Sequence, residues 1–230
     1  MASMTLRQAR KRLSQWRLGL TSSRYESGGR GAATISTGHG DPGGVSYGEY
    51  QLSSKAGTLQ AYLAQSRFAS RFAGMKPATH AFDAMWRRLV RTEAAFAAEQ
   101  HDFIGRTHYD TQLARLRDAG IDLSHAGRAV QDLLWSTAVQ YGALTLSIIS
   151  RALHGTFGAT ADASTLSDTQ IVTAVQDYKL AHLETLFAHS RALWPGLRRR
   201  IVDEKRDLLR LAEAERIVGA AGVSKTTNPV

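Results

Sequence analysis

The chain has 230 residues, of which 43% are hydrophobic, so it can bury a sizeable core. It contains no cysteine, which excludes disulfides, thiolate nucleophiles and cysteine-based zinc sites. Lysine and arginine total 29 against 20 acidic residues, and the net charge of +9 favours an anionic partner such as nucleic acid, a membrane surface or the bacterial cell wall. No apolar run approaches the roughly 18 residues of a membrane-spanning helix, so we expect no membrane insertion.

The N-terminal region is basic and carries no readable export signal. Its cations are not followed by the continuous apolar segment of a signal peptide, so we expect synthesis in the cytoplasm without a cleavable signal. Apolar residues at spacings of three and four predict a basic amphipathic helix over residues 1–20. The residues that carry this pattern are Leu6, Ala9, Leu13, Trp16 and Leu20.

The segment from Gly28 to Gly48 holds eight glycines and one proline. A long helix is implausible in such a segment, because glycine and proline both disfavour the helix interior. A loop-rich region with a short β-hairpin is the natural prediction.

Helical patterns return after Ser53 and continue to the end of the chain. Ser124 is expected to cap a helix that carries Val130 and Leu134, and Ser167 with Gln170 fits a capping box that opens the next helix.

The end of the chain completes the predicted architecture. After the break at Trp194-Pro195-Gly196, a last helix should run from about residue 197 to about 218, with residues 221–230 as a flexible tail. The prediction is a mainly α (α+β) fold: one catalytic domain over residues 1–220 with a glycine-rich hairpin region after the first helices.

Two carboxylates in residues 26–53 suggest the chemistry of this segment. Glu26 ends a short helix before the glycine-rich loop, and Asp41 follows 15 residues later inside it. Glycoside cleavage needs one protonated carboxyl group to donate to the leaving oxygen and one ionised group to position water or stabilise positive charge on the sugar. Desolvation could keep Glu26 protonated, while Asp41 should stay ionised among free backbone N–H groups.

Three short motifs carry a family resemblance. Glu26-Ser27-x-Gly29, Gly38-x-Gly40-Asp41-x-Gly43 and Gly48-x-x-Gln51-Leu52 resemble the core signature of goose-type lysozymes and soluble lytic transglycosylases. The stretch Gly40–Gly48 is similar, more closely still, to phage-borne and type VI secreted muramidases. The resemblance implies a lysozyme-like fold, a Gly-x-x-Gln stretch that opens the next helix, and Glu26 and Asp41 in the catalytic roles.

The function implied is a peptidoglycan-degrading glycosidase, a muramidase that cleaves the β-1,4 bond between N-acetylmuramic acid and N-acetylglucosamine. Ser53 stands where goose-type enzymes often carry a second aspartate, and Gln140 stands where transglycosylases carry an asparagine. A lytic transglycosylase that forms anhydro products is therefore an alternative. A non-catalytic cell-wall-binding module is an alternative of another class.

Further residues are candidates for binding the glycan. Glu49 is also a rival to Asp41 as second carboxylate. The substrate-binding candidates are Ser27, His39, Tyr47, Glu49, Gln51, Gln140 and Tyr141. No metal-ligand spacing is present, and no metal or cofactor is expected.

The expected partners follow from this function. Peptidoglycan glycan strands would be the substrate, and an immunity, phage or secretion protein a further partner, with no nucleic acid bound because no nucleic-acid-binding motif is recognisable. A bacteriolytic effector or endolysin of this kind would be delivered by phage or secretion and act in the cell wall of a target bacterium.

Overall fold

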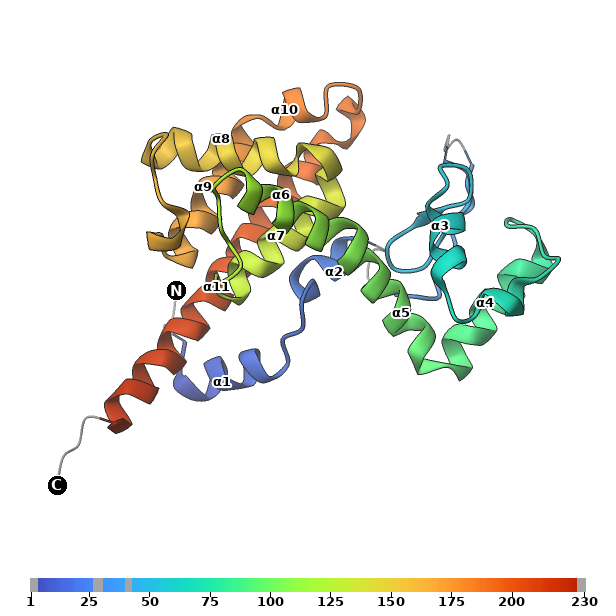
Figure 1. Ribbon diagram of the computed structural model, residues 1–230, viewed down its shortest axis with the longest axis horizontal. Helices are drawn as coiled ribbons and strands as arrows, with labels where there is room; N and C mark the ends of the chain where they lie inside the picture. The colour runs from blue at the N-terminus through green and yellow to red at the C-terminus, as the bar shows by residue number, and fades with distance from the viewer. Residues whose placement is uncertain (1–3, 27–30, 40–42, 227–230) are drawn as a thin grey trace. The chain divides into compact units, whose positions relative to one another are not determined.

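The protein divides into two compact units, which the computed structural model describes over residues 4–26, 31–39 and 43–226 (Figure 1). The side chains of Arg24, Glu26 and residues 222–226 lie outside this description. Unit 1 consists of Met1–Ser22 with His108–Val230, and unit 2 is Ser23–Thr107. Most described residues are helical, which confirms the mainly α prediction, whereas the lysozyme-like details are not confirmed.

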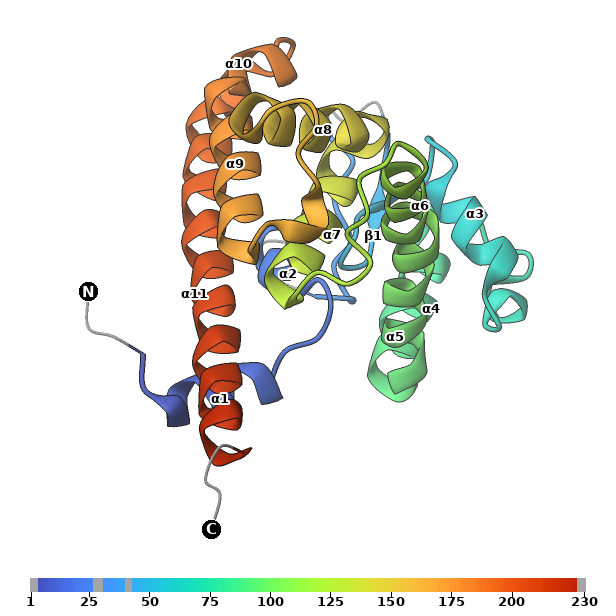
Figure 2. The ribbon, with the colours of Figure 1, turned by 60° about the vertical axis from the view of Figure 1, so that its left-hand side comes forward.

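Unit 1 is a helical assembly around α7. Its helices are α1 (Leu6–Ser14), the start of α2 (Leu20–Glu26), α6 (Asp110–Asp118), α7 (Arg128–Tyr141), α8 (Thr145–Phe157), α9 (Asp168–Ala181), α10 (Leu183–Leu186) and α11 (Trp194–Thr226), with the 3₁₀ turns η3 (Gly142–Leu144), η4 (Ala163–Thr165) and η5 (Arg191–Leu193). α9 runs beside α11, and α1 crosses the C-terminal part of α11 (Figures 1 and 2). α7 packs against α8, α9 and α11, and most of its side chains are buried.

The predicted N-terminal helix is shorter than expected. α1 begins with a capping box between Thr5 and Gln8 and ends at Ser14 instead of continuing to Leu20. Five residues further on, Gly19 has a φ of 78° and lies so close to the Trp135 indole that a Cβ would be 2.7 Å from the ring, so no helix continues through it to Leu20. The chain turns at this glycine and then starts α2.

The capping predictions have different outcomes. The capping box of Ser167 with Gln170 is confirmed at the start of α9. The prediction that Ser124 caps the following helix is wrong, since α7 begins at Arg128 with Gly127 as its N-cap.

The last helix is longer than predicted. α11 runs from Trp194 to Thr226, so it includes the first six residues of the predicted tail, and the other four lie outside the described part of the chain. Pro195 does not break this helix, because the first turn of a helix needs no N–H from its residues.

One helical stretch of unit 1, Arg128–Phe157, is long and apolar enough by length and composition to cross a membrane. It comprises α7, η3 and α8, and 56% of its most apolar window is buried in the structure. That burial is typical of a core helix. The expectation of no membrane insertion stays a prediction.

Unit 2 contains the predicted hairpin and a small group of helices. Its elements are the strands β1 (Ser46–Tyr47) and β2 (Leu52–Ser53), the helices α3 (Thr58–Gln65), α4 (His80–Thr92) and α5 (Ala94–Ile104), the 3₁₀ turn η1 (Ala69–Phe72), and most of the π-helical turn η2 (Gly105–Tyr109). The strands pair antiparallel, with Ser46 opposite Ser53 and Tyr47 opposite Leu52.

Aromatic rings form the core of unit 2. Trp86 is fully buried; its ring centroid lies 4.8 Å from that of Phe96 and 5.2 Å from that of Tyr47, and its indole N–H donates to the Ala32 carbonyl at 2.9 Å. The other buried rings of this core are Tyr62, Phe72, Phe82 and Phe103. The hairpin is therefore anchored to α4 through Tyr47.

Candidate functional site

Glu26 is the last described residue of α2 (Leu20–Glu26). Its side chain, and all of Ser27 and Asp41, lie outside the described residues, so their catalytic and binding roles stay predictions. What the structure does describe is how both ends of the surrounding segment are held: the start of α2, and the hairpin after the glycine-rich loop.

The start of α2 is fixed by Asp132, a fully buried residue of α7. Its carboxylate accepts hydrogen bonds from the backbone N–H of Gly19 at 2.8 Å, from the N–H of Thr21 at 3.1 Å and from the Thr21 hydroxyl at 2.5 Å. Burial raises the pKa of Asp132, and the hydrogen bonds oppose part of that rise. A helix that begins on this anchor ends one and a half turns after Thr21 at Glu26.

The Gly-x-x-Gln motif forms the turn of the hairpin, not the start of a helix as the resemblance implied. Gly48 and Gln51 both have positive φ, 80° and 52°, and the Gln51 side-chain amide donates to the Gly48 carbonyl at 2.9 Å. Gln51 therefore closes its own turn. The next helix begins only at Thr58.

The turn packs directly against α5. A Cβ on Gly48 would overlap the Gln100 side chain, which is 1% exposed. Beside this contact, the Tyr50 hydroxyl and Nδ1 of His101 form a hydrogen bond of 2.6 Å. Glu49, Tyr50 and His101 are all half-buried, so each has part of its surface open to solvent.

Two other binding candidates of unit 2 lie in contrasting places. Tyr47 is fully buried; its hydroxyl donates to Asp83 at 2.7 Å and accepts from the Ala78 N–H at 2.7 Å. Its ring has no face open to a sugar, so the predicted binding role of Tyr47 is wrong and its role is packing. His39 is exposed, and its backbone N–H donates to the Thr37 hydroxyl at 3.4 Å.

Gln140 and Tyr141 end α7 in unit 1. Gln140 is half-buried, whereas Tyr141 is 8% exposed and its ring packs against Phe187, with 5.4 Å between the centroids. Burial raises the pKa of the Tyr141 phenol. The ammonium of Lys179 lies 5.4 Å from the centre of the same ring.

Lys179 belongs to a buried polar group that joins α9 to α11. Lys179 is fully buried and Glu204 is 1% exposed, while the Gln176 amide donates to the Glu204 carboxylate at 3.0 Å. Burial lowers the pKa of Lys179 to about 8, although the nearby Glu204 opposes that change. Lys179, Gln176 and Glu204 are all buried, so they pack against Tyr141 inside the unit and present no surface to a ligand.

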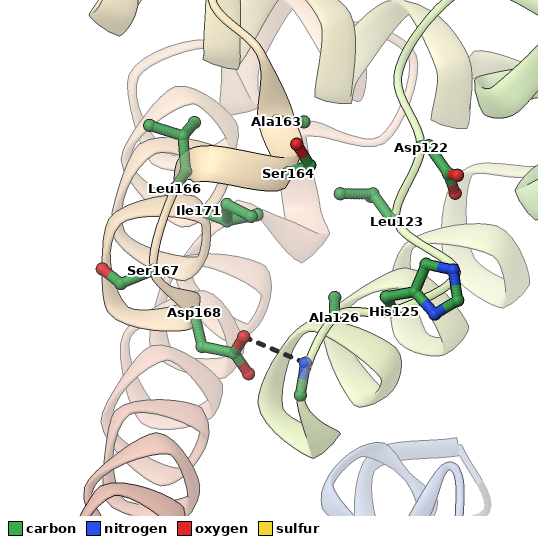
Figure 3. Close-up of a pocket in the computed structure, with 11 residues that line it drawn as sticks. Asp122, Leu123, His125, Ala126, Ala163, Ser164, Leu166, Ser167, Asp168 and Ile171 are labelled. Atoms are coloured by element: carbon green, nitrogen blue, oxygen red, sulfur yellow. Dashed lines mark hydrogen bonds between the residues drawn. The ribbon is translucent and has the colours of Figure 1, made fainter.

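A pocket of about 180 Å³ opens beside the start of α7 (Figure 3). It is too small for a disaccharide, since ligand pockets usually measure about 300–1,000 Å³. The carboxylate of Asp168 lines this pocket, and one of its oxygens accepts a hydrogen bond from the Gly127 N–H at 3.0 Å (Figure 3). Asp168 therefore helps to fix the start of α7. The pocket lining is Asp122, Leu123, His125, Ala126, Gly127, Ala163, Ser164, Leu166, Ser167, Asp168 and Ile171.

Residues 18–205 match the family described as Type VI secretion system spike protein VgrG3-like, C-terminal. The match includes all of unit 2 and most of unit 1. The chain belongs to this VgrG3-like C-terminal family.

A relative of this VgrG3-like domain is the type VI secretion system spike protein VgrG3 of Vibrio cholerae serotype O1. The two are 46% identical over 197 residues, which is 85% of this chain and 19% of the relative. The chain thus spans about a fifth of the length of the curated relative that it matches.

The family match corrects the resemblance drawn from the motifs. The VgrG3-like domain is not assigned to the goose-type lysozyme and soluble lytic transglycosylase superfamily. That resemblance depended on the glycine spacing between Glu26 and Leu52, whereas the family match extends over residues 18–205. A short motif of glycines specifies turns, and turns of the same shape occur in unrelated families.

Sequence reasoning missed the buried charges of the VgrG3-like domain. Asp132 is the only charged residue between Ala129 and Tyr141, and Lys179 falls four residues after Val175 on a core face. A charge at a core position was the available signal. Among the described residues there is no cluster of three or more potential metal ligands.

Proposed function

We propose that this VgrG3-like domain is the peptidoglycan-directed part of a type VI spike protein and that it cleaves the glycan strand as a muramidase. Glu26 would protonate the glycosidic oxygen between N-acetylmuramic acid and N-acetylglucosamine. Asp41 would position water or stabilise the oxocarbenium-like state. Delivery by the secretion apparatus would bring the domain to the cell wall of a target bacterium.

The position of Glu26 is the observation that carries this proposal. It is the last residue of a helix whose first turn is fixed by the buried Asp132, and the glycine-rich segment with Asp41 follows at once. A general acid benefits from such a support, because small errors in its position are costly in rate. The family supports delivery by a spike, and the net charge of +9 supports attraction to an anionic wall.

A non-catalytic cell-wall-binding module is the second candidate. The family and the relative are both described as components of a spike, and neither description names a reaction. Such a module would hold glycan strands without cutting them.

The test is mass spectrometry of the soluble products after purified peptidoglycan is digested with the wild type and with Glu26→Gln. Muropeptides with reducing muramic ends, lost in the variant, are the expected result. Anhydro-muramic ends would instead indicate a lytic transglycosylase, with water not used as the nucleophile. Glu184→Gln is a matched control, because it makes the same chemical change at a carboxylate that is 64% exposed and that has only a 3.9 Å ion pair with Arg198.

The two candidates predict different results with intact sacculi. No product from the wild type, together with retention on sacculi, would reject the muramidase and favour the binding module. Cleavage by Glu26→Gln at the wild-type rate would remove Glu26 from the mechanism.

A further inference from the structure

We propose that one face of α1 is a docking surface for the carboxylates of peptidoglycan stem peptides. This α1 surface is formed by Arg7, Arg10 and Lys11. The choice of ligand rests on the proposed function, whereas the existence of a cationic surface rests on the sequence and geometry of unit 1 alone.

The three cations of the α1 surface lie on one side of the helix. Successive residues of an α-helix are turned by about 100°, so Arg7, Arg10 and Lys11 fall within an arc of about 100°. All three residues are exposed. Ala9 lies on the other side of the helix and is fully buried. The helix therefore turns its small apolar residue inward and its charges to solvent.

Packing against α11 fixes the helix that carries this surface. α1 crosses the C-terminal part of α11 (Figure 2), and the Arg12 guanidinium donates to the Asp207 carbonyl of α11 at 3.3 Å. The capping box of Thr5 with Gln8 fixes the first turn. A partner that binds a helix already in place loses little conformational entropy in ordering it. α1 also precedes residues 18–205, so it is an addition to the part of the chain that matches the family.

The charges of the α1 surface are not neutralised by neighbouring acids. Residues 1–25 contain no aspartate or glutamate. None of the three side chains forms an ion pair or hydrogen bond with a residue that the structure describes. Cations of α11 differ, since Lys205 pairs with Asp177 at 2.6 Å and Arg206 with Asp203 at 2.9 Å. The positive potential over α1 is therefore available to an anionic partner.

The composition of α1 decides among the anionic partners. Stable attachment to a membrane needs an inserted apolar side in addition to basic residues, and the buried side of α1 is turned to α11. Binding of single-stranded nucleic acid depends on aromatic rings that stack on bases, and α1 contains none. A guanidinium pairs a carboxylate through two parallel hydrogen bonds. Stem peptides carry such carboxylates along the strand that the domain is proposed to cleave.

The experiment measures binding to intact wall. Glu26→Gln protein is co-sedimented with purified sacculi, so that the wall is not cut. In this background, Arg7→Gln, Arg10→Gln and Lys11→Gln are combined, since glutamine is neutral and favours helices. We expect the triple variant to raise the apparent Kd about tenfold. Sacculi stripped of stem peptides by an amidase should bind the parent and the triple variant equally.

A triple variant with scattered changes is the matched control. Arg115→Gln, Arg151→Gln and Arg199→Gln remove the same net charge from exposed positions of unit 1, on α6, α8 and α11. The α1 surface predicts a change in Kd of less than about twofold for this control. An equal loss in the control would overturn the surface, because net charge alone would then explain the binding.

The remaining outcomes separate the surface from the proposed function. If the parent binds sacculi and the α1 triple variant binds as tightly, the surface is wrong and the proposed function stands. If binding through α1 persists on stripped sacculi, or appears on vesicles of equal parts phosphatidylcholine and phosphatidylglycerol, the stem peptide is not the ligand. If the wild type releases no soluble product but binding to sacculi still depends on α1 and the stem peptides, the muramidase fails and the surface stands.

Discussion

Unit 1 buries charged side chains in a helical core, whereas unit 2 buries aromatic rings. Asp132, Lys179 and Glu204 are each no more than 1% exposed in unit 1. Among the described residues of unit 2, no charged side chain is buried to this extent, and seven aromatic rings fill the core. Both units have apolar cores, and they differ in what they bury besides aliphatic side chains: charged groups in unit 1 and a larger set of aromatic rings in unit 2.

The difference determines which substitutions lower the stability of each unit. The carboxylates of Asp132 and Glu204 accept directed hydrogen bonds, so the removal of one partner leaves other polar groups unsatisfied in a dry environment. Aromatic cores depend on contact area and shape, so they are damaged by an added atom as readily as by a lost one. Substitutions chosen for each unit can test this contrast.

The largest effect is expected for Asp132→Ala. The change leaves the N–H groups of Gly19 and Thr21 without their acceptor and should lower the free energy of unfolding by about 3 kcal/mol. Asp132→Asn, which keeps the shape and one good acceptor, should cost less than Asp132→Ala. Urea unfolding followed by circular dichroism measures both.

Asp118→Ala is the control for this change, because Asp118 is an exposed carboxylate at the end of α6. It should alter stability by no more than about 0.5 kcal/mol. An equally small effect of Asp132→Ala would mean that the buried carboxylate is not what holds the start of α2, and the contrast between the units would lose its main support.

The same contrast explains what could be predicted from the sequence. The hairpin was predictable because glycine favours the backbone conformations of tight turns. The capping box of Ser167 with Gln170 was predictable because its two hydrogen bonds join residues three positions apart. The anchoring of α2 on Asp132 was not, because it joins residues 111 positions apart in the sequence. The close approach of Gly19 to the Trp135 ring could not be predicted for the same reason, because the two residues are far apart in the sequence.

The candidate site was only partly predictable. The sequence placed Glu26 in a short helix before the glycine-rich loop, and α2 is described up to Glu26, while Glu49 and Gln51 fall in the turn of the hairpin. Tyr47 was misjudged because alternation along a strand of two residues gives no reliable inside and outside. The short motifs suggested the wrong superfamily, although the similarity of Gly40–Gly48 to type VI secreted proteins did indicate the secretion system that the family match names.

An intermediate effect is expected in unit 2 for Gly48→Ala. The added methyl group would overlap Gln100 and approach the Trp86 ring at 3.2 Å, and the backbone would keep an unfavourable φ of 80°. Gly57→Ala is a matched control with a φ of 86° and no heavy atom within 4 Å of the new Cβ. We expect a loss of about 1 kcal/mol for Gly57→Ala and about 2 kcal/mol or more for Gly48→Ala in urea unfolding. Equal losses would show that only the backbone, and not the close packing, limits this position.

The last prediction is a dependence of stability on pH caused by Lys179. Its pKa is about 8 in the folded protein and 10.5 ordinarily, so between these values the unfolded chain binds more protons than the folded one. The free energy of unfolding should therefore rise as the pH rises from 8 towards 10. Above pH 10 the buried tyrosines oppose this rise, because burial raises their pKa values, to about 12 for Tyr109, and their protonated folded forms lose stability there.

Urea unfolding at intervals between pH 8 and 10 measures this slope in the wild type and in Lys179→Met. The variant should have a smaller slope, since methionine has a similar length and no titrating group. Lys76→Met is the control, because Lys76 lies in an exposed loop of unit 2 and its removal should leave the slope unchanged. A slope that survives in Lys179→Met would assign the pH dependence to other groups and would show that the buried ammonium is satisfied as well in the folded protein as in water.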